Sequence, residues 1–543
     1  MNDALEMIRT RGAATPQRER ADRRQEKNRA GGYAFTVPGE TRIRRFLTLG
    51  SEGTYYATQR QMTADNAPVL LDWARNRAPE LVALATEISV VGRAPRNQPA
   101  LLAIAAVGSL GDVAGRRAAA QALPLVARTG THLYTWAKYR EQFGGWGPLT
   151  RRAAASWYLG KDPDDLAYQL VKYRQRDGWS HADVLRLAHP KPRHADGALM
   201  EMHDRLFGWV TSGVVPDGLL PRVVSAYLRA RDIERGVARP AAKAAAYAAL
   251  VRDNPGLPWE ALPDEATSQA EVWRALIDTG LPMTALLRNL PKMTRLGVLA
   301  PMSEHLAKVC AQLRDGERLR KARVHPVAIL VAVKTYASGR AEKGDSAWVP
   351  VPQVIDAMTD AFYLAFGAVE AAGKRTSINL DISASMGTSA AGYCISAREV
   401  TAAMSLVVMA TEPAWDVHGF SHSYVPLAIS PRMRLDDVVR AIRGLPFGYT
   451  DCALPMVWAA KNRVEVDTFQ VWTDNETWFG DVHPHQALDA YRQRMGIDAR
   501  LQVIATTPTG FSIADPDDPL TLDVSGFDSD VPNLLANHSA GRL

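Results

Sequence analysis

The chain has 543 residues, of which 47% are hydrophobic, 22% charged and 8% aromatic. These globular proportions exclude a disordered, collagen-like or purely coiled-coil chain, and the length predicts about two to four domains or a repeat array with one further domain. Because no run of about 18 apolar residues is present, we expect no membrane span. Residues 1–28 are charged and lack the apolar core of a secretory signal, and three cysteines are too few for a disulfide framework. The sequence therefore predicts a cytoplasmic protein with reduced thiols.

The charge is divided unevenly along the chain. Residues 1–365 carry 51 Lys and Arg against 37 Asp and Glu, a net of +14, whereas residues 366–543 carry 13 against 21, a net of −8. Such an asymmetry indicates that the first part meets a polyanion and the second does not.

The first 30 residues are polar and rich in arginine, which predicts a mobile tail. From about residue 65 to 365, apolar residues recur at helical spacing and strand-like alternation is nearly absent. This pattern fits about seven helical repeats of ~40 residues, with an irregular helical domain as the alternative. The expected helices include 68–77, 79–91, 98–109, 114–128, 149–158, 166–176, 219–230, 240–252, 271–276, 283–290, 302–313 and 326–337.

The pattern changes near residue 373, where short apolar strands begin to alternate with helices. This alternation predicts a mostly parallel sheet with helices on both faces, and a strand pair within 415–429 would add one antiparallel edge. The expected strands are 376–380, 415–420, 425–429, 468–472 and 501–505, and the expected helices are 396–410, 435–442, 453–462 and 484–494.

The sharpest chemical signal is a D-x-S-x-S pattern, Asp381, Ser383 and Ser385, directly after the first of these strands. This is the pattern of a metal-ion-dependent adhesion site in von Willebrand factor A domains, and it lies where open α/β sheets place their ligands. Thr450, before a helix, and Asp474, after the next strand, supply a further hydroxyl and a second carboxylate. Hard oxygen ligands with room for water suit one divalent cation, and Mg²⁺ above all.

Other chemical motifs are weaker. The pairs His483/His485 and His418/His422 have ligand-like spacing, but neither has a matching cluster of cysteines or carboxylates that would indicate zinc. No phosphate-binding P-loop, no G-x-S-x-G elbow and no recognisable cysteine nucleophile motif occurs. We therefore expect no catalytic residue and no enzyme activity.

The basic part contains one dense segment and one stripe that could contact the phosphates of a polyanion. Asp162 and Pro163 begin a helix that Gly178 is expected to end, and Ser180 with Asp183 forms a capping box for the next helix. His181 falls in that helix's first turn, where backbone N–H groups favour phosphate. The alternative for these charges is a solvated helix face. The candidate phosphate-contact residues are Lys172, Arg174, Arg176, His181, Arg186, Lys191 and Arg193 in the dense segment, and Arg288, Lys292 and Arg295 in the stripe.

Several segments resemble hallmarks of the Ro autoantigen (TROVE) family. They are Phe46–Tyr56, Lys172–His181, Leu287–Gly297, Asp381–Met386, Thr450–Met456 and Thr473–Thr477, and the matches extend from about residue 31 to about 505. The composition, rich in Ala and Arg, is typical of a bacterial orthologue from a high-GC genome.

The resemblance implies a ring of HEAT-like helical repeats closed by an α/β von Willebrand factor A domain. It divides the chain into a tail (1–30), a TROVE helical-repeat RNA-binding domain (31–365) and the A domain (366–543). It also implies that a monomeric ring binds small noncoding Y RNA on its outer basic surface and single-stranded 3′ ends of misfolded RNA in its central hole. Relatives act in RNA quality control, decay or maturation with exoribonucleases, and in stress survival.

Two other classes of function are alternatives to RNA binding. The first is an A-domain scaffold that binds protein through its cation without RNA, against which the +14 of residues 1–365 argues. The second is a Mg²⁺-dependent nuclease, but two-metal nucleases need more clustered carboxylates than this site supplies.

Overall fold

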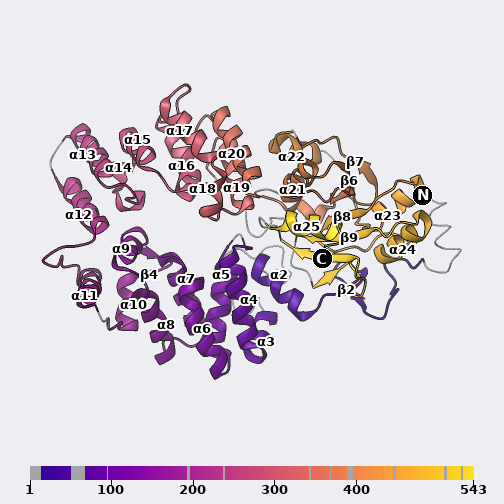
Figure 1. Cartoon of the computed structure of the whole chain (residues 1–543), viewed down its shortest axis with the longest axis horizontal. Helices are drawn as coiled ribbons and strands as arrows, with labels where there is room; N and C mark the ends of the chain where they lie inside the picture. The colour runs from indigo at the N-terminus through magenta and orange to yellow at the C-terminus, as the bar shows by residue number, and fades with distance from the viewer. Residues whose placement is uncertain are drawn as a thin grey trace.

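The computed structural model describes residues 14–49, 68–94, 96–192, 196–236, 239–341, 344–366, 369–387, 395–431, 433–443, 448–506, 510–526 and 530–542. Within these residues a long array of α-helices is followed by an α/β domain (Figure 1). The predicted fold class is therefore confirmed. No helix in the described part of the chain is long and apolar enough to cross a membrane.

The helical array follows one curved path that starts beside the α/β domain and returns to it (Figure 1). Successive helices share contacts, since α4 packs on both α5 and α6, and α6 packs on α8. Such nearest-neighbour packing is typical of helical repeats. The helices are α2 (Gly39–Leu49), α3 (Pro68–Asn76), α4 (Ala78–Val91), α5 (Gln98–Leu110), α6 (Val113–Val126), α7 (Gly130–Phe143), α8 (Pro148–Leu159), α9 (Pro163–Lys172), α10 (His181–Ala188), α11 (Gly197–Ser212), α12 (Arg222–Arg235), α13 (Pro240–Asp253), α14 (Asp264–Thr267), α15 (Ala270–Thr279), α16 (Met283–Arg295), α17 (Glu304–Leu313), α18 (Gly316–Lys321), α19 (Pro326–Ala337) and α20 (Pro352–Leu364).

Local chemistry explains the boundaries of α9 and α10. Asp162 caps α9 by accepting hydrogen bonds from the backbone N–H groups of its first turn, and Ser180 forms the predicted capping box with Asp183. The expected helix 166–176 ends earlier, at Lys172, because Tyr173 leaves the helical conformation with φ −114° and ψ 66°. Further on, Asp177 and Gly178 adopt positive φ of 53° and 85°. An Asp-Gly pair with two positive φ angles forms a tight hairpin turn. It joins β3 (Gln175–Arg176) to β4 (Trp179–Ser180).

The α/β domain is built on a six-stranded sheet of order β11-β9-β8-β5-β6-β7. Only β7 is antiparallel, which confirms the predicted antiparallel edge. The strands are β5 (Arg375–Asp381), β6 (Ala414–Phe420), β7 (Tyr424–Pro426), β8 (Thr468–Thr473), β9 (Arg500–Ala505) and β11 (Thr521–Ser525), and the helices are α21 (Ala397–Thr411), α22 (Leu435–Arg443), α23 (Leu454–Asn462), α24 (Pro484–Met495) and α25 (Val531–Ser539).

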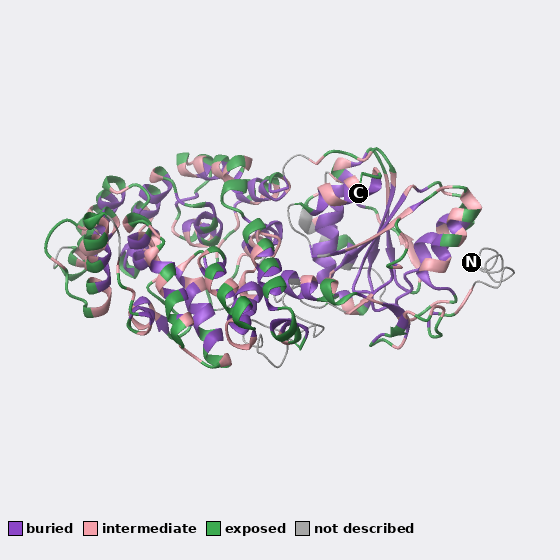
Figure 2. Ribbon diagram, turned by 60° about the horizontal axis from the view of Figure 1, so that its bottom comes forward, coloured by how far each residue is buried: buried purple, intermediate pink, exposed green. Residues whose placement is uncertain are grey.

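Side chains of alternate residues on the central strands enter two separate cores, as expected for a sheet covered on both faces. Phe469 and Val471 pack with residues of α23 and α24. Trp472 and Ile504 belong to the core that contains the buried residues of α21. Figure 2 shows the central strands of the sheet almost entirely buried, whereas many helices of the array have a buried and an exposed side.

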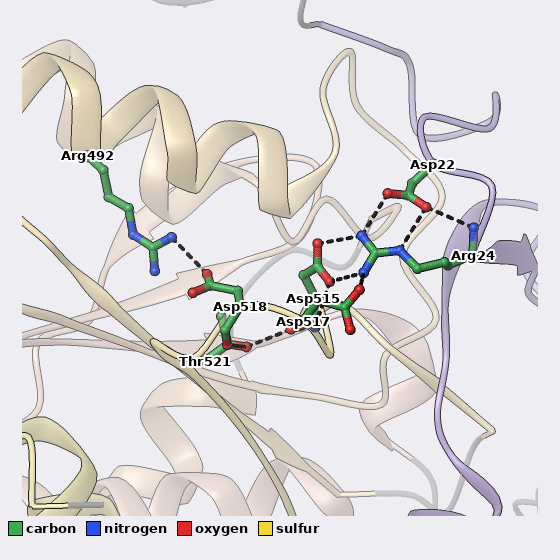
Figure 3. Close-up of polar contacts among 7 residues, drawn as sticks. All are labelled: Asp22, Arg24, Arg492, Asp515, Asp517, Asp518 and Thr521. Carbon is green, nitrogen blue, oxygen red and sulfur yellow. Dashed lines mark hydrogen bonds and ion pairs between the residues drawn. The ribbon is translucent and has the colours of Figure 1, made fainter.

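Residues 14–36 form an N-terminal arm on the α/β domain, so the expected mobile tail over 1–30 is wrong for residues 14–30. Within the arm, β1 (Gln25–Lys27) pairs with β2 (Tyr33–Thr36), and β2 pairs with β10 (Phe511–Ser512) of the α/β domain. The guanidinium of Arg24 binds Asp515, Asp517 and Asp22 (Figure 3). Ion pairs and strand pairing hold the arm in place; residues 1–13 lie outside the described part of the chain.

Both ends of the helical array are attached to the α/β domain. At its start, α2 contacts β11. At its end, Lys334 of α19 forms an ion pair of 2.7 Å with Glu399 of α21, whose side chain is only 2% exposed. The array also touches itself, because Arg323 after α18 donates to the carbonyl of Val90 in α4 at 2.7 Å. These contacts close the array into a ring.

Candidate cation site and basic cavities

The two predicted acidic ligands lie at the edge of the sheet formed by the carboxyl ends of its parallel strands. Asp381 is the last residue of β5, and Asp474 directly follows β8. Since β5 and β8 are adjacent and parallel, their carboxyl ends bring the two carboxylates together. Both side chains are fully buried, at 0% exposure.

Hydrogen bonds orient Asp381 and the serines that follow it. Its Oδ1 accepts from the backbone N–H of Ser383 at 2.8 Å, and its Oδ2 accepts from the hydroxyl of Thr473 at 2.7 Å. The hydroxyl oxygens of Ser383 and Ser385 lie 2.9 Å apart. A carboxylate and two hydroxyls are thus gathered in the turn after β5.

Thr450 reaches the same edge from the loop before α23. Its carbonyl accepts from the backbone N–H groups of Trp478 and Phe479 at 3.2 and 3.1 Å, which ties its loop to the segment after Asp474. All five predicted metal-ligating residues therefore come from three loops at one end of the sheet.

The electrostatics of this edge suit a cation. Burial, and then the neighbouring charge of Asp474, raise the pKa of Asp381 above its usual range. A divalent cation between the carboxylates would offset both effects, and carboxylate and hydroxyl oxygens are ligands that Mg²⁺ accepts. The donor set of these residues therefore fits the expected cation.

The histidine pairs considered for zinc serve other contacts. The ring of His418 stacks on Tyr424 with centroids 4.4 Å apart, and Nε2 of His483 lies 2.8 Å from the carbonyl oxygen of Glu19. Within the described ranges no group of three or more His, Cys, Asp and Glu is arranged to hold a metal. Nothing in the described residues supports a zinc site.

The dense basic segment divides around the β3–β4 hairpin. Arg174 and Arg176 are exposed, and the guanidinium of Arg174 lies 5.3 Å from the ring of Tyr227. Lys172 is half-buried, and its ammonium donates to the hydroxyl of Tyr168 at 3.1 Å. Arg186, also exposed, donates to the carbonyl of Thr211 at 2.7 Å. The remaining two candidates are Lys191, which is exposed, and Arg193, which lies outside the described residues.

His181 differs from the expectation that it contacts phosphate. Its side chain is only 2% exposed, its Nδ1 lies 2.9 Å from the hydroxyl of Tyr158, and its ring stacks on Trp157. Burial lowers its pKa to about 3, so the imidazole is neutral. This buried, hydrogen-bonded core histidine has no free surface for RNA, because α10 turns its first residue toward α8.

A cavity of about 770 Å³ adjoins the hairpin, and we refer to it as the hairpin cavity. Arg174, Arg231 and Arg235 line it together with Trp209 and Tyr227. Arg231 lies 5.1 Å from the ring of Tyr227, so two guanidinium groups pack against one aromatic ring. Arg231 and Arg235 were not among the candidates from the sequence, although the four arginines of 222–235 are a visible signal.

The predicted stripe lines a second cavity of about 690 Å³, which we refer to as the α16 cavity. Arg288, Lys292 and Arg295 border it from α16, and Trp348 closes part of its wall. Arg288 and Arg295 are exposed, whereas Lys292 is half-buried and donates to the hydroxyl of Thr267 at 2.9 Å. The three residues therefore share one concave surface, as their spacing predicts.

A half-buried carboxylate connects the two basic groups. Burial raises the pKa of Glu260, and the positive charges of Lys172 and Arg288 oppose that shift. Lys172 belongs to the dense segment and Arg288 to the stripe, so one acidic side chain lies within electrostatic reach of both. The two candidate RNA-contact groups are neighbours at this point.

The comparisons with known proteins agree with this architecture. Residues 26–210 and 255–335 match the TROVE domain, and residues 375–539 match the Ro60 vWA domain. A TROVE helical array joined to a von Willebrand factor A domain is thus the class of protein that the fold defines.

Relatives match over nearly the full length. An RNA-binding protein RO60 of Deinococcus radiodurans is 41% identical over 535 residues, covering 97% of this chain and 98% of that protein. One from Caenorhabditis elegans is 32% identical over 597 residues, covering 97% and 92%. The crystal structure of the Deinococcus radiodurans RO (RSR) protein covers 93% of this chain and 100% of its own, with 40% identity and a TM-score of 0.69. The chain belongs to the Ro60 family, which confirms the resemblance seen in its sequence.

Proposed function

We propose that this protein binds RNA through the cations of its helical array and does not itself cleave it. The observation that carries the proposal is the pair of basic cavities, of which one places two guanidinium groups against the ring of Tyr227. Arginines attract phosphates, and aromatic side chains in nucleic-acid-binding grooves offer faces on which unpaired bases stack. The relatives are named RNA-binding proteins, which supports binding of RNA.

The two cavities suit different parts of an RNA. We assign a structured small RNA of the Y RNA type to the surface around the hairpin cavity, where Arg174, Arg176 and Lys191 are exposed. We assign the single-stranded 3′ end of misfolded RNA to the α16 cavity, on its way through a central hole of the ring. In this proposal a monomeric cytoplasmic protein presents such ends to an exoribonuclease in RNA decay or maturation and under stress.

Charge reversal tests the RNA proposal. The first variant carries Arg174→Glu and Arg231→Glu, and the second carries Arg288→Glu and Arg295→Glu. A control variant carries Lys461→Glu and Arg463→Glu, which make the same charge change on the α/β domain. We expect the first pair to weaken a structured RNA more and the second to weaken a duplex with a single-stranded 3′ tail more. Fluorescence anisotropy at several salt concentrations gives the affinity, and each lost phosphate contact lowers the log–log slope by roughly 0.7–0.9.

The control variant separates local contacts from net charge. Lys461 and Arg463 are exposed and lie outside both cavities, so this double variant should leave both affinities within about twofold. If all three variants weaken binding equally, the cavities are not the binding sites. If none does, RNA binding does not use this surface.

We further propose that Asp381, Ser383, Ser385, Thr450 and Asp474 hold one Mg²⁺ ion. Their convergence at one edge of the sheet and the two buried carboxylates support this assignment. The ion would neutralise that edge and leave room for a water or a partner's oxygen. Asp381→Ala should abolish Mg²⁺ binding in calorimetry while far-UV circular dichroism stays unchanged; unaltered affinity would remove Asp381 from the site.

A further inference from the structure

Gln17 of the N-terminal arm is buried between the two loops that carry Thr450 and Asp474. Its exposure is 0%. Its amide Nε2 donates to Oδ1 of Asp451 at 2.7 Å and to the carbonyl of Val482 at 2.9 Å, while its Oε1 accepts from the hydroxyl of Thr477. One side chain therefore joins the residue after Thr450 to the segment after Asp474.

The backbone of Gln17 is fixed as well. Its N–H donates to the carbonyl of Gly480 at 3.0 Å, and its carbonyl accepts from the N–H of Tyr33 at 2.8 Å. The amide of Asn28 in the same arm donates to the carbonyl of Thr477 at 2.6 Å. The arm thus forms several hydrogen bonds with the 474–480 loop, and Gln17 also forms one with the loop of Thr450.

Close packing leaves this junction little freedom. A Cβ on Gly32 would lie 2.2 Å from the carbonyl oxygen of Thr477, and one on Gly480 would lie 2.5 Å from a carboxylate oxygen of Asp451. The arm and both loops are therefore closely packed against one another. Because no free space separates them, a change in the arm alters the distance between the two loops.

We propose that Gln17 is a positioning residue of the cation site: it fixes the distance between the Thr450 and Asp474 loops and so sets the affinity and selectivity for the divalent cation. The inference rests on the proposed Mg²⁺ site. Mg²⁺ demands near-ideal octahedral geometry at short metal–oxygen distances, whereas Ca²⁺ tolerates longer and variable ones. Loss of the fixed spacing therefore weakens Mg²⁺ binding more than Ca²⁺ binding.

Two variants test this role in the full-length protein. Gln17→Glu keeps the shape of the side chain but replaces the amide donor that faces Asp451, and Gln17→Leu removes the side chain's hydrogen bonds. Calorimetry with Mg²⁺ and with Ca²⁺ should show a loss of Mg²⁺ affinity of at least about tenfold, with a smaller loss for Ca²⁺. General destabilisation would not change the ratio of the two affinities.

Arg24→Met is the matched control, because it loosens the arm where it meets Asp515 and Asp517 (Figure 3), which belong to neither cation loop. We expect it to lower the thermal midpoint and keep the Mg²⁺ affinity within about twofold. An equal loss in Arg24→Met and Gln17→Leu, or an unchanged Mg²⁺/Ca²⁺ ratio in both Gln17 variants, would overturn the inference. A wild-type protein that binds neither ion would instead overturn the cation site itself.

Discussion

The Nη2 nitrogen of Arg45 donates to both carboxylate oxygens of Asp523, at 2.6 and 2.8 Å. This contact joins α2, the first helix of the array, to β11 at the edge of the sheet. Nη1 of Arg45 also donates to the carbonyl of Phe511 at 2.8 Å, and the arginine side chain is only 1% exposed. A buried ion pair thus anchors the start of the ring.

Replacing Arg45 by methionine should destabilise the protein strongly. The change leaves Asp523 without its main partner, and breaking a buried pair from one side costs about 3–5 kcal/mol. Urea unfolding followed by circular dichroism measures the loss. Arg44→Met is the control, since Arg44 is 38% exposed and pairs with Glu40 on the surface, where such a pair contributes about 0–1 kcal/mol. Similar losses in both variants would contradict this role of the buried pair.

Buried His181 should make the stability depend on pH. Its pKa in the folded protein is about 3, well below the usual value of 6.5 for histidine, so the unfolded chain binds the extra proton first as the pH falls. The stabilising effect of neutral His181 is complete above about pH 6.5 and is lost between that pH and about 3, at up to about 1.4 kcal/mol per pH unit.

His181→Gln should therefore show a shallower decline of the unfolding free energy between pH 7 and pH 5 than the wild type. Urea unfolding at both pH values gives the two slopes. The exposed His189, replaced by Asn, serves as the control and should keep the wild-type slope. Identical slopes in the wild type and His181→Gln would place the pH dependence elsewhere.

The cation site should be visible in the stability of Asp381→Asn. Without divalent cations this variant should be at least as stable as the wild type, because it removes one of two buried, mutually repelling carboxylates. With Mg²⁺ at 100 times its dissociation constant, the wild type should gain about 2.7 kcal/mol and the variant nothing. Thermal melting with EDTA and with Mg²⁺ checks both statements; a variant that gains as much as the wild type would refute them.

Removing the charge of Glu260 should strengthen RNA binding. In Glu260→Gln, Lys172 and Arg288 lose a competing negative neighbour and become freer to attract phosphate. An effect of about 0.2–1 kcal/mol corresponds to at most roughly a fivefold gain in affinity. Glu465, exposed on the α/β domain, provides the control as Glu465→Gln. Weaker RNA binding by Glu260→Gln would show that Lys172 and Arg288 do not contact the RNA.

The predictable features of the fold and of the cation site arise from contacts close in sequence. The caps at Asp162 and Ser180 are local, and the turn after β5 places Asp381, Ser383 and Ser385 together within five residues. Strand-to-helix alternation was enough to place Asp474 at the same edge. The antiparallel edge at β7 followed from two strands separated by a short turn.

What the sequence could not show depends on contacts between distant residues. Gln17 and Asp451 form a hydrogen bond although they are 434 residues apart in the sequence. The polar sequence of the arm has no pattern that indicates which residues it contacts. His181 was correctly placed at the start of a helix, but its burial depends on Tyr158 of another helix. Strand β11 and the short strands of the arm escaped prediction because their sequences are short and partly polar.

The position of the arm also has a consequence for the order in which the chain folds. Gln17 leaves the ribosome long before the loop of Asp451, and their separation of 434 residues takes roughly 20–90 s to synthesise at 5–20 residues per second. Throughout that interval the arm has none of its strand and side-chain partners from the α/β domain, whereas the helices of the array can pair with neighbours already made. The ring is thus completed last at the place where it begins.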